Sequence, residues 1–484
     1  MIRIVRTREQ SLEQPKSRDQ TENARGQSAD SAIVSARPFT TIAASPTAFI
    51  LIAFLCTVVV CFLYRPLNQP ESGDASIYDY IAQAILRGQL PYRDVIDPKG
   101  PGGMYLSAFG LLIGRFLGIA DVAAIRLLHI LMFGLLSAAT YLVARLYLKS
   151  NRAALLAFLL PLLPWRFVIM MISGTQPKLP MMLFGLLVLL AIERDRPFWA
   201  GALSMLSCLC WQPGLLFGGV AFLIFSRYLT SWKDLRAFKV VAGAAIPLGL
   251  VLLYFHHKGA LSDFANWTFV YDYTAFMPSG EKPLATSLVH FWSVSLRFFE
   301  KEIGAALIAV PGFIWYLARR VRTVIAARSL AKRADIYMDA VVIPPLVYFA
   351  FCMLNFQSGP DLIPFLPFVG IFGAFFIIEF LNVAGSRLKM RNPATVRLAE
   401  SRVFGVIVCL IFLATLVHGL RYQLPHPTLA DQRRDVALVE GYLRPGDKVY
   451  IHETAEVLVL LNLPNLNPYV AFDSGADDYI GRTI

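Results

Sequence analysis

Long apolar runs constrain the fold of this 484-residue chain more than any other feature of its sequence. Hydrophobic residues make up 56% of the chain and charged residues only 16%, which is more apolar surface than one soluble core of this size can bury. A helix of about 20 apolar residues crosses a bilayer core, and many windows qualify, from Thr47–Tyr64 to Val403–Leu420. The chain is therefore predicted to be an all-α polytopic membrane protein.

Short basic runs between the apolar segments carry the net charge of +12. Such runs mark the cytoplasmic connections of membrane proteins, so they favour a topological role over nucleic-acid binding. We require basic and non-basic connections to alternate, which gives about eleven spans. The predicted spans are 47–64, 123–147, 153–172, 178–193, 198–212, 214–229, 239–257, 303–319, 338–354, 361–382 and 403–420.

One apolar segment, Met104–Ile119, is short for a span and is interrupted by two glycines and Arg115. It is predicted to lie along the outer membrane surface as an interfacial helix. With the N-terminus in the cytoplasm, a loop at 66–103, a second loop at Lys258–Glu302 and the tail from Arg421 then lie outside. Large outer loops on a rigid bundle are where functional residues are expected.

Three domains follow from this threading. Residues 1–46 are polar and of mixed charge, and are predicted to form a disordered cytoplasmic tail. Residues 47–420 are predicted to form the transmembrane module, and 421–484 a small extracytoplasmic α/β element. In that element, Leu429–Leu443 favours a helix, Arg444–Asp447 a turn and Lys448–His452 a short strand.

The first outer loop, 66–103, is unusually rich in charge for so hydrophobic a chain. Its first half has apolar residues at helical spacing up to Gly88, which predicts an amphipathic helix with Asp79 and Arg87 on its polar face. Asp79 is thereby open to the interpretation of a solvated residue that pairs with Arg87. Asp74 stands at the start of this helix, where a carboxylate suits a helix cap.

The second half of the loop combines prolines and glycines with Arg93, Asp94, Asp97 and Lys99. Such a stretch fixes its backbone without regular secondary structure, which suits groups that bind a ligand at a membrane surface. Asp97 precedes Lys99 by two residues and is expected to orient it.

These residues resemble the GT-C superfamily of membrane glycosyltransferases. The shared order is an acidic residue at Asp74, a helix with Tyr80-Ile-Ala, then Pro91-Tyr-Arg-Asp94 and Asp97-Pro-Lys-Gly-Pro101. The protein O-mannosyltransferase-like and aminoarabinose lipid A transferase-like branches are most similar. Looser similarity continues at Trp211–Gly214, at 360–367 and at 445–447.

The resemblance implies transfer of a sugar from a polyprenyl-phosphate donor to an acceptor hydroxyl on the extracytoplasmic face, by displacement with inversion. It implies a bacterial inner (plasma) membrane protein that builds the cell envelope, with a glycan, lipid or protein acceptor. Asp74 corresponds to the catalytic carboxylate, which is expected to act as a general base buried under the rim of the bundle. Lys99 corresponds to the residue that contacts the donor phosphate, with Arg93 as a second cation. Secondary candidates are Glu71, Asp79, Asp94, Asp97 and Asp361.

Two departures from the family pattern argue against a divalent metal held between two acids. Ala75 follows Asp74 where many relatives have a second acid, and Gln176 stands at the second acidic position of the next outer loop. His256 and His257 are the alternative metal ligands, although a histidine at a membrane interface also suits a polar helix end. No cofactor is expected with certainty.

Two other classes of protein remain as alternatives. A lipid or glycan transporter or flippase also needs many spans, but it is typically built from two related halves with ionisable residues near mid-membrane, and no such repeat is visible. A non-catalytic membrane assembly factor has no need for the Asp74 and Lys99 loop.

Overall fold

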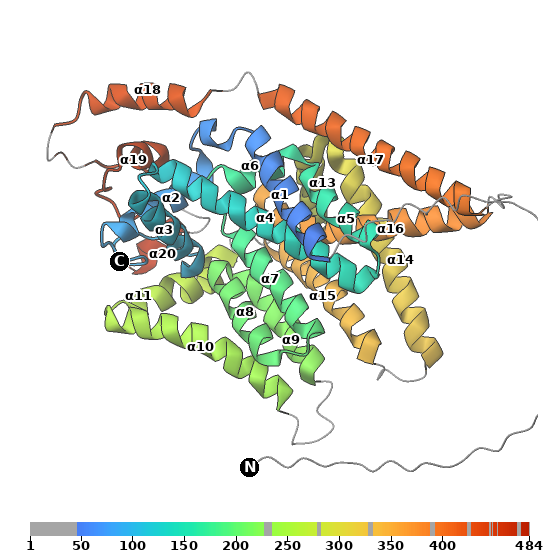
Figure 1. The fold of residues 1–484 in the computed structure, drawn as a ribbon. Helices are drawn as coiled ribbons and strands as arrows, with labels where there is room; N and C mark the ends of the chain where they lie inside the picture. Colours follow the sequence, from blue (N-terminus) through green and yellow to red (C-terminus); the bar gives the residue numbers. More distant parts are fainter. Residues whose placement is uncertain are drawn as a thin grey trace, which may run out of the picture. The chain divides into compact units, whose positions relative to one another are not determined.

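The computed structural model describes residues 46–226, 235–277, 282–327, 333–387, 393–423, 427–444, 447, 449–452, 454–471 and 476–483. Most of the predicted N-terminal tail therefore lies outside the described residues. The described part of the chain is all-α, with three isolated β-bridges in place of a sheet (Figure 1). The predicted all-α fold is confirmed.

Every predicted span contains a helix. The helices of the bundle are α1 (Pro46–Leu63), α4 (Asp121–Leu148), α5 (Asn151–Leu159), α6 (Trp165–Ile172), α7 (Lys178–Glu193), α8 (Pro197–Cys210), α9 (Leu215–Ser226), α10 (Arg236–His257), α14 (Ile303–Ala327), α15 (Arg333–Leu354), α16 (Leu366–Arg387) and α17 (Pro393–Gln423). Within the described residues, five helices are long and apolar enough to cross a membrane, or six if the α5–α6 pair, bent by 76°, forms one span. The predicted number of about eleven crossings thus exceeds what helix length and composition support by themselves.

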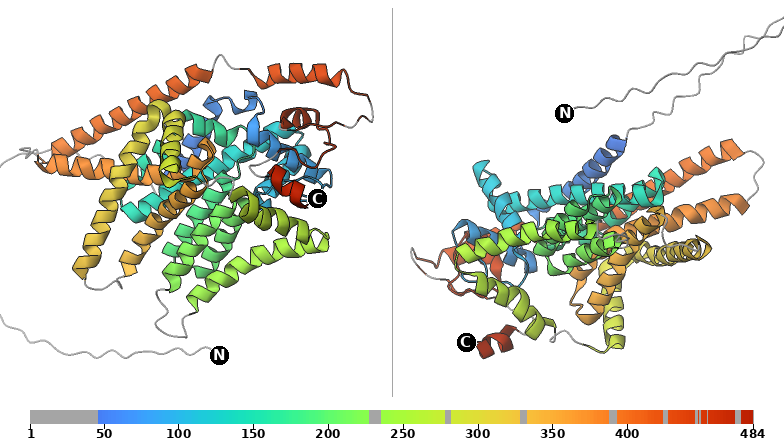
Figure 2. Two further views of the ribbon diagram at one scale, coloured as in Figure 1. Left: turned by 180° about the vertical axis from the view of Figure 1, so that it is seen from behind. Right: turned by 90° about the horizontal axis from the view of Figure 1, so that it is seen from below.

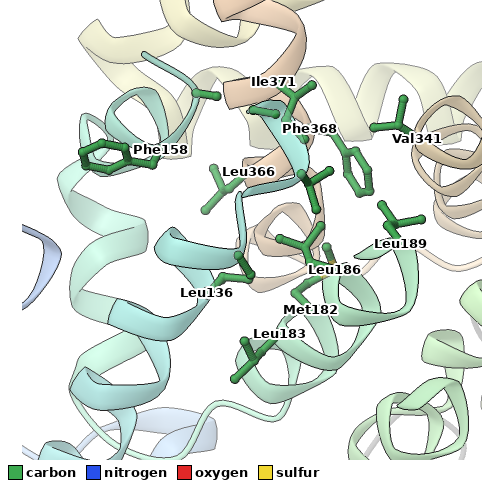
Figure 3. Close-up of a cluster of buried hydrophobic side chains, with 14 of the residues drawn as sticks. Leu136, Phe158, Met182, Leu183, Leu186, Leu189, Val341, Leu366, Phe368 and Ile371 are labelled. Atoms are coloured by element: carbon green, nitrogen blue, oxygen red, sulfur yellow. The ribbon is translucent and has the colours of Figure 1, made fainter. Parts of the chain in front are cut away.

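The hydrophobic core lies where α4, α5, α7, α15 and α16 meet (Figure 3). Leu136, Leu186 and Ile371, from three of these helices, are all buried. Glycines bring other helix pairs together: a Cβ on Gly201 of α8 would lie 1.9 Å from the Val240 carbonyl oxygen of α10. Small residues at crossings are typical of membrane helices, because the backbones must approach closely to pack.

Most of the shorter helices lie around one end of the bundle, and α13 (Leu284–Phe299) packs beside α14 and α15 (Figure 2). The others are α2 (Gly73–Leu86), α3 (Pro101–Phe116), α11 (Leu261–Ala265), α18 (Leu429–Glu440), α19 (Ala455–Leu461) and α20 (Ala476–Thr483). Single turns join the elements: 3-10 turns at Pro66–Asn68, Leu160–Leu162, Gln212–Gly214, Glu300–Glu302 and Gly359–Phe365, and π-helical turns at Asn266–Val270 and Asp272–Phe276.

Helix α2 confirms the amphipathic helix predicted in the first outer loop, and it ends before Gly88, whose φ of +89° suits a residue without a side chain. Helix α3 forms where the interfacial helix was expected. Helix α13 was not anticipated within the second outer loop. The strand predicted at Lys448–His452 is not formed by the residues that are described, which contribute only an isolated bridge between Val449 and Asn465.

Candidate active site

A fully buried arginine on α4 organises the start of the first outer loop. Arg126 donates hydrogen bonds to the carbonyl oxygens of Pro66 (2.8 Å), Gln69 and Pro70 (3.2 Å), and to Oε1 of Glu71 (2.6 Å). A buried guanidinium is tolerated only when acceptors surround it, so this set of bonds fixes the path of the loop into α2. Sequence reasoning missed Arg126, although an arginine inside the apolar run 123–147 was a usable signal.

Glu71 and Asp79 form a buried carboxyl pair beside Arg126. Neither side chain reaches solvent, and Oδ1 of Asp79 accepts a hydrogen bond of 2.8 Å from the Thr175 backbone N–H. Burial raises the pKa of Glu71 to about 8, with a further contribution from the nearby Asp79, and burial raises the pKa of Asp79 to about 6. Burial therefore favours a proton on the pair, and with one proton the pair carries a single negative charge opposite the single positive charge of Arg126.

The solvated position expected for Asp79 is therefore wrong, because the helix face that carries it packs against the connection after α6. Its expected partner Arg87 instead donates to Oδ1 of Asn462 at 2.8 Å and lies over the Tyr80 ring. The hydrophobic pattern identified the helix correctly but could not identify a polar residue that is buried by a distant segment.

Asp74 lies in the first turn of α2 with an exposed side chain. The residue at the N-cap position is Ser72, so the cap interpretation of Asp74 is wrong, as is the expected burial under the bundle rim. Gly73, just before it, donates its backbone N–H to Oε1 of Glu456 at 3.2 Å. Among the residues that the structure describes, the Asp74 carboxylate has no hydrogen-bond or ion-pair partner.

The connection between α6 and α7 runs close beside the start of α2. A Cβ on Gly174 would lie 2.8 Å from the Cβ of Ala75, so a larger residue there would collide with the helix that carries Asp74. The next residues are also held: Thr175 Oγ1 donates to Ser107 Oγ of α3 at 2.8 Å, and Gln176 N–H donates to Nε2 of His129 at 3.1 Å. Gln176 thus lies in the connection that borders the first turn of α2.

Lys99 stands immediately before α3 on a backbone that is held from both sides. Its N–H donates to Oδ1 of Asp97 at 2.8 Å, and its carbonyl oxygen accepts from the Tyr92 hydroxyl at 2.8 Å. The following residue, Gly100, lies against the end of α8, where a Cβ would be 2.3 Å from the Leu209 carbonyl oxygen. Asp97 thus contacts the backbone of Lys99, and its role in orienting the Lys99 side chain stays a prediction.

A second cation lies at the start of α7. Lys178 Nζ is 2.8 Å from Oδ1 of Asp361 and 4.6 Å from the centre of the Trp211 ring. The other oxygen of Asp361 accepts the backbone N–H groups of Gln357 (2.9 Å) and Ser358 (3.3 Å). Three predicted outer connections therefore meet at this cluster. Lys178 was missed, and its place directly after Gln176 and Pro177 was the available signal.

Arg93 and Asp94, also predicted from the loop, make contacts outside the Asp74 region. Arg93 lies 2.9 Å from Oδ2 of Asp263 and also donates to the Gly259 carbonyl, which ties the loop to the turn between α10 and α11. Oδ2 of Asp94 accepts the Leu90 N–H at 2.7 Å.

His256 and His257 are exposed at the end of α10. Across the described residues, no group of three His, Cys, Asp or Glu side chains is arranged to hold a metal ion.

Comparison with known proteins yields one sequence relative and several structures. No family model matches the chain. A dolichol phosphate-mannose mannosyltransferase of Haloferax volcanii is 26% identical over 222 residues, which is 45% of this chain and 47% of the relative. The match thus spans about half the length of that relative.

Two crystal structures of ArnT from Cupriavidus metallidurans match most of both chains. The apo state has a TM-score of 0.59 at 15% identity over 90% of this chain and 88% of ArnT, and the complex with undecaprenyl phosphate has a TM-score of 0.57 at 14% identity over 87% and 86%. The oligosaccharyltransferase AglB from Archaeoglobus fulgidus, in complex with an inhibitory peptide and a dolichol-phosphate, has a TM-score of 0.53 at 13% identity over 89% of this chain and 65% of AglB. At 13–15% identity these structures show that the chain shares the fold of ArnT and AglB, which is the fold that the resemblance of the first outer loop implied.

Proposed function

We propose that the chain transfers a sugar from a polyprenyl-phosphate donor to an acceptor hydroxyl, by a single displacement that inverts the anomeric carbon. The reaction takes place on the extracytoplasmic face, where the threading puts α2, Lys99 and the C-terminal element. The mannosyltransferase relative and the two neighbours bound to undecaprenyl phosphate or dolichol-phosphate support this donor class. The acceptor is a glycan, a lipid or a protein.

The observation that carries the proposal is the contrast between Asp74 and the other acids of its loop. Glu71 is paired with Arg126, and Asp94 and Asp97 accept backbone N–H groups within the loop. In the described part of the chain, Asp74 alone among the loop acids keeps both carboxylate oxygens available. A general base needs such an oxygen to accept the proton of the attacking hydroxyl.

The remaining chemistry is the departure of a phosphate. The acceptor oxygen forms a bond to the anomeric carbon while its proton passes to Asp74, and the bond between that carbon and the phosphate oxygen breaks. The polyprenyl phosphate leaves with an additional negative charge. The ammonium of Lys99 stabilises this charge, because a cation near a developing anion is worth several kcal/mol, on the order of an oxyanion-hole donor.

Lys178 is a further basic residue near this region. It is already paired with Asp361 and lies over Trp211, so its charge is largely compensated. The family resemblance assigns the phosphate contact to Lys99, and we propose this role for it, with Arg93, which is held by Asp263, as a secondary cation.

The test uses the purified full-length chain in nanodiscs with a panel of polyprenyl-phosphate sugars. The Asp74→Asn variant should transfer sugar about 10²- to 10⁴-fold more slowly, because asparagine accepts hydrogen bonds but is no base. Lys99→Ala should lower the rate and weaken donor binding. The matched control is Asp435→Asn on the exposed side of α18, which should be as active as the unmodified chain.

Full transfer activity in Asp74→Asn would contradict the assignment of the base. In proteoliposomes, movement of the intact donor across the bilayer without release of free polyprenyl phosphate would instead favour the transporter alternative.

A further inference from the structure

The C-terminal element contacts two of the three residues that precede Asp74, Glu71 and Gly73. Gln432 of α18 makes a two-way contact with Glu71: the Glu71 N–H donates to Gln432 Oε1 at 2.8 Å, and Gln432 Nε2 donates to the Glu71 carbonyl at 2.8 Å. Glu456 of α19 accepts the Gly73 N–H at 3.2 Å. Both contacts are made to backbone groups of α2 or of the segment that enters it. They therefore fix the position of the backbone, not the conformation of a side chain.

The first turn of α2 needs such a contact. Four N–H groups at the start of a helix lack partners within the helix, and a side chain at the N-cap position normally accepts one of them. Ser72 makes no side-chain capping bond, and Gly73 has a φ of +53°. The carboxylate of Glu456 supplies the missing acceptor from a separate helix, and its negative charge is favoured at the positive end of the helix dipole.

The rest of α2 also contacts the C-terminal element, and α19 lies beside it (Figure 1). Gln83 Nε2 donates to the Val459 carbonyl at 3.1 Å, and the Asn465 N–H donates to the Tyr80 hydroxyl at 2.8 Å. Buried apolar residues of both helices, among them Ile81 and Leu458, belong to one hydrophobic cluster. Helix α19 is thus docked on α2 independently of Glu456.

We propose that Glu456 and Gln432 are positioning residues for catalysis: the C-terminal element sets the place of the first turn of α2 and thereby of the Asp74 carboxylate. This inference rests on the proposed function of Asp74. It adds a role for the small C-terminal element. A displacement of about 1 Å in a reacting group can cost about 10²-fold in rate, so a contact that acts only through the backbone is sufficient.

Three variants separate positioning from folding. Glu456→Ala removes the acceptor but leaves the apolar contacts of α19, and should lower kcat about tenfold with little change in KM for the donor. Glu456→Gln retains an oxygen that can accept the Gly73 N–H, and should restore most of the rate. Glu440→Ala, on the exposed end of α18, is the matched control and should behave as the unmodified chain.

Hydrogen exchange gives a readout that does not depend on activity. In Glu456→Ala, the amides of residues 73–76 should exchange about tenfold faster or more, while the amides of α4 and α7 should keep their protection. Gln432→Ala should produce the same local change at residues 71–73.

The inference is overturned if Glu456→Ala keeps both the rate and the exchange pattern of the unmodified chain. It is also overturned if Glu456→Gln is as impaired as Glu456→Ala, or if protection is lost uniformly over the bundle. Failure of the proposed function has a different signature. Asp74→Asn would then be fully active, while the exchange of residues 73–76 in Glu456→Ala would still report on the contact between Glu456 and Gly73.

Discussion

Asp74 and the Glu71–Asp79 pair lie within nine residues of each other, yet they occupy opposite environments. The pair is buried, is bonded to Arg126 and Thr175, and has raised pKa values. Asp74 is exposed at the start of the same helix. The difference teaches that the loop contains two kinds of carboxylate, one that holds the loop in place and one that is available to a substrate.

The buried group connects three parts of the chain. Arg126 comes from α4, Glu71 from the entry to α2, and Thr175 from the connection before α7. Buried ionic groups of this kind cost desolvation, so their presence indicates a structural requirement for a defined loop conformation rather than a gain in stability over an apolar core. The variants below change one side of the comparison at a time.

The largest effect on stability is expected from removing the cation of the buried group. Arg126→Leu leaves Glu71 and three carbonyl oxygens without a donor, and should lower the free energy of unfolding by about 3–5 kcal/mol. Thermal and denaturant unfolding in detergent measure this change.

Arg115→Leu is the matched control on the surface. Arg115 is paired with Asp121 at 2.7 Å but is partly exposed, so its removal should cost less than about 1 kcal/mol. Equal losses of unfolding free energy in the two variants would show that burial does not distinguish Arg126 from Arg115.

A smaller effect is expected from the pH dependence of stability. Burial raises the pKa of Glu71 from 4.5 to about 8, so the folded state holds a proton that the unfolded state releases. The contribution of Glu71 to stability is therefore fully present below about pH 4.5 and is lost as the pH rises to about 8. Asp79, with its pKa raised to about 6, acts in the same direction over a lower range. The melting temperature should fall between pH 5 and pH 8.

Glu71→Gln tests the origin of that slope. Glutamine imitates the protonated acid and still offers Arg126 an oxygen, so the variant should lose much of the decrease between pH 5 and pH 8. An unchanged dependence of melting temperature on pH in Glu71→Gln would assign the decrease to other groups. It would also show that Glu71 and Asp79 do not hold a proton between them in the folded state.

The sequence was sufficient for the parts of the fold that depend on local pattern. The apolar runs predicted the bundle helices, the 3.6-residue spacing predicted α2, and Gly88 predicted its end. The motif around Asp74 and Lys99 predicted the fold that the chain shares with the two ArnT structures.

The remaining features depend on contacts between distant segments. Asp79 was placed on a solvated face because no local pattern reveals that the connection at Thr175 covers it. The contact of Glu456 with Gly73 joins residues 383 positions apart. The described residues of the strand predicted at Lys448–His452 form only one isolated bridge, between Val449 and the distant Asn465. Periodicity describes a segment's own shape but not which surface it meets.

The smallest effect on stability is expected at Asp74 itself. Its side chain is exposed and has no partner among the described residues, so Asp74→Asn should change the free energy of unfolding by no more than about 0.5 kcal/mol, the part due to the helix dipole included. The same variant is expected to lose nearly all transfer activity. A residue that is dispensable for folding and essential for turnover is a reactive group. For Arg126→Leu we expect the opposite: a large decrease in the free energy of unfolding and a smaller decrease in the rate per folded molecule. If Asp74→Asn instead unfolds as readily as Arg126→Leu, the two kinds of carboxylate are one structural network, and the base must be sought elsewhere in the loop.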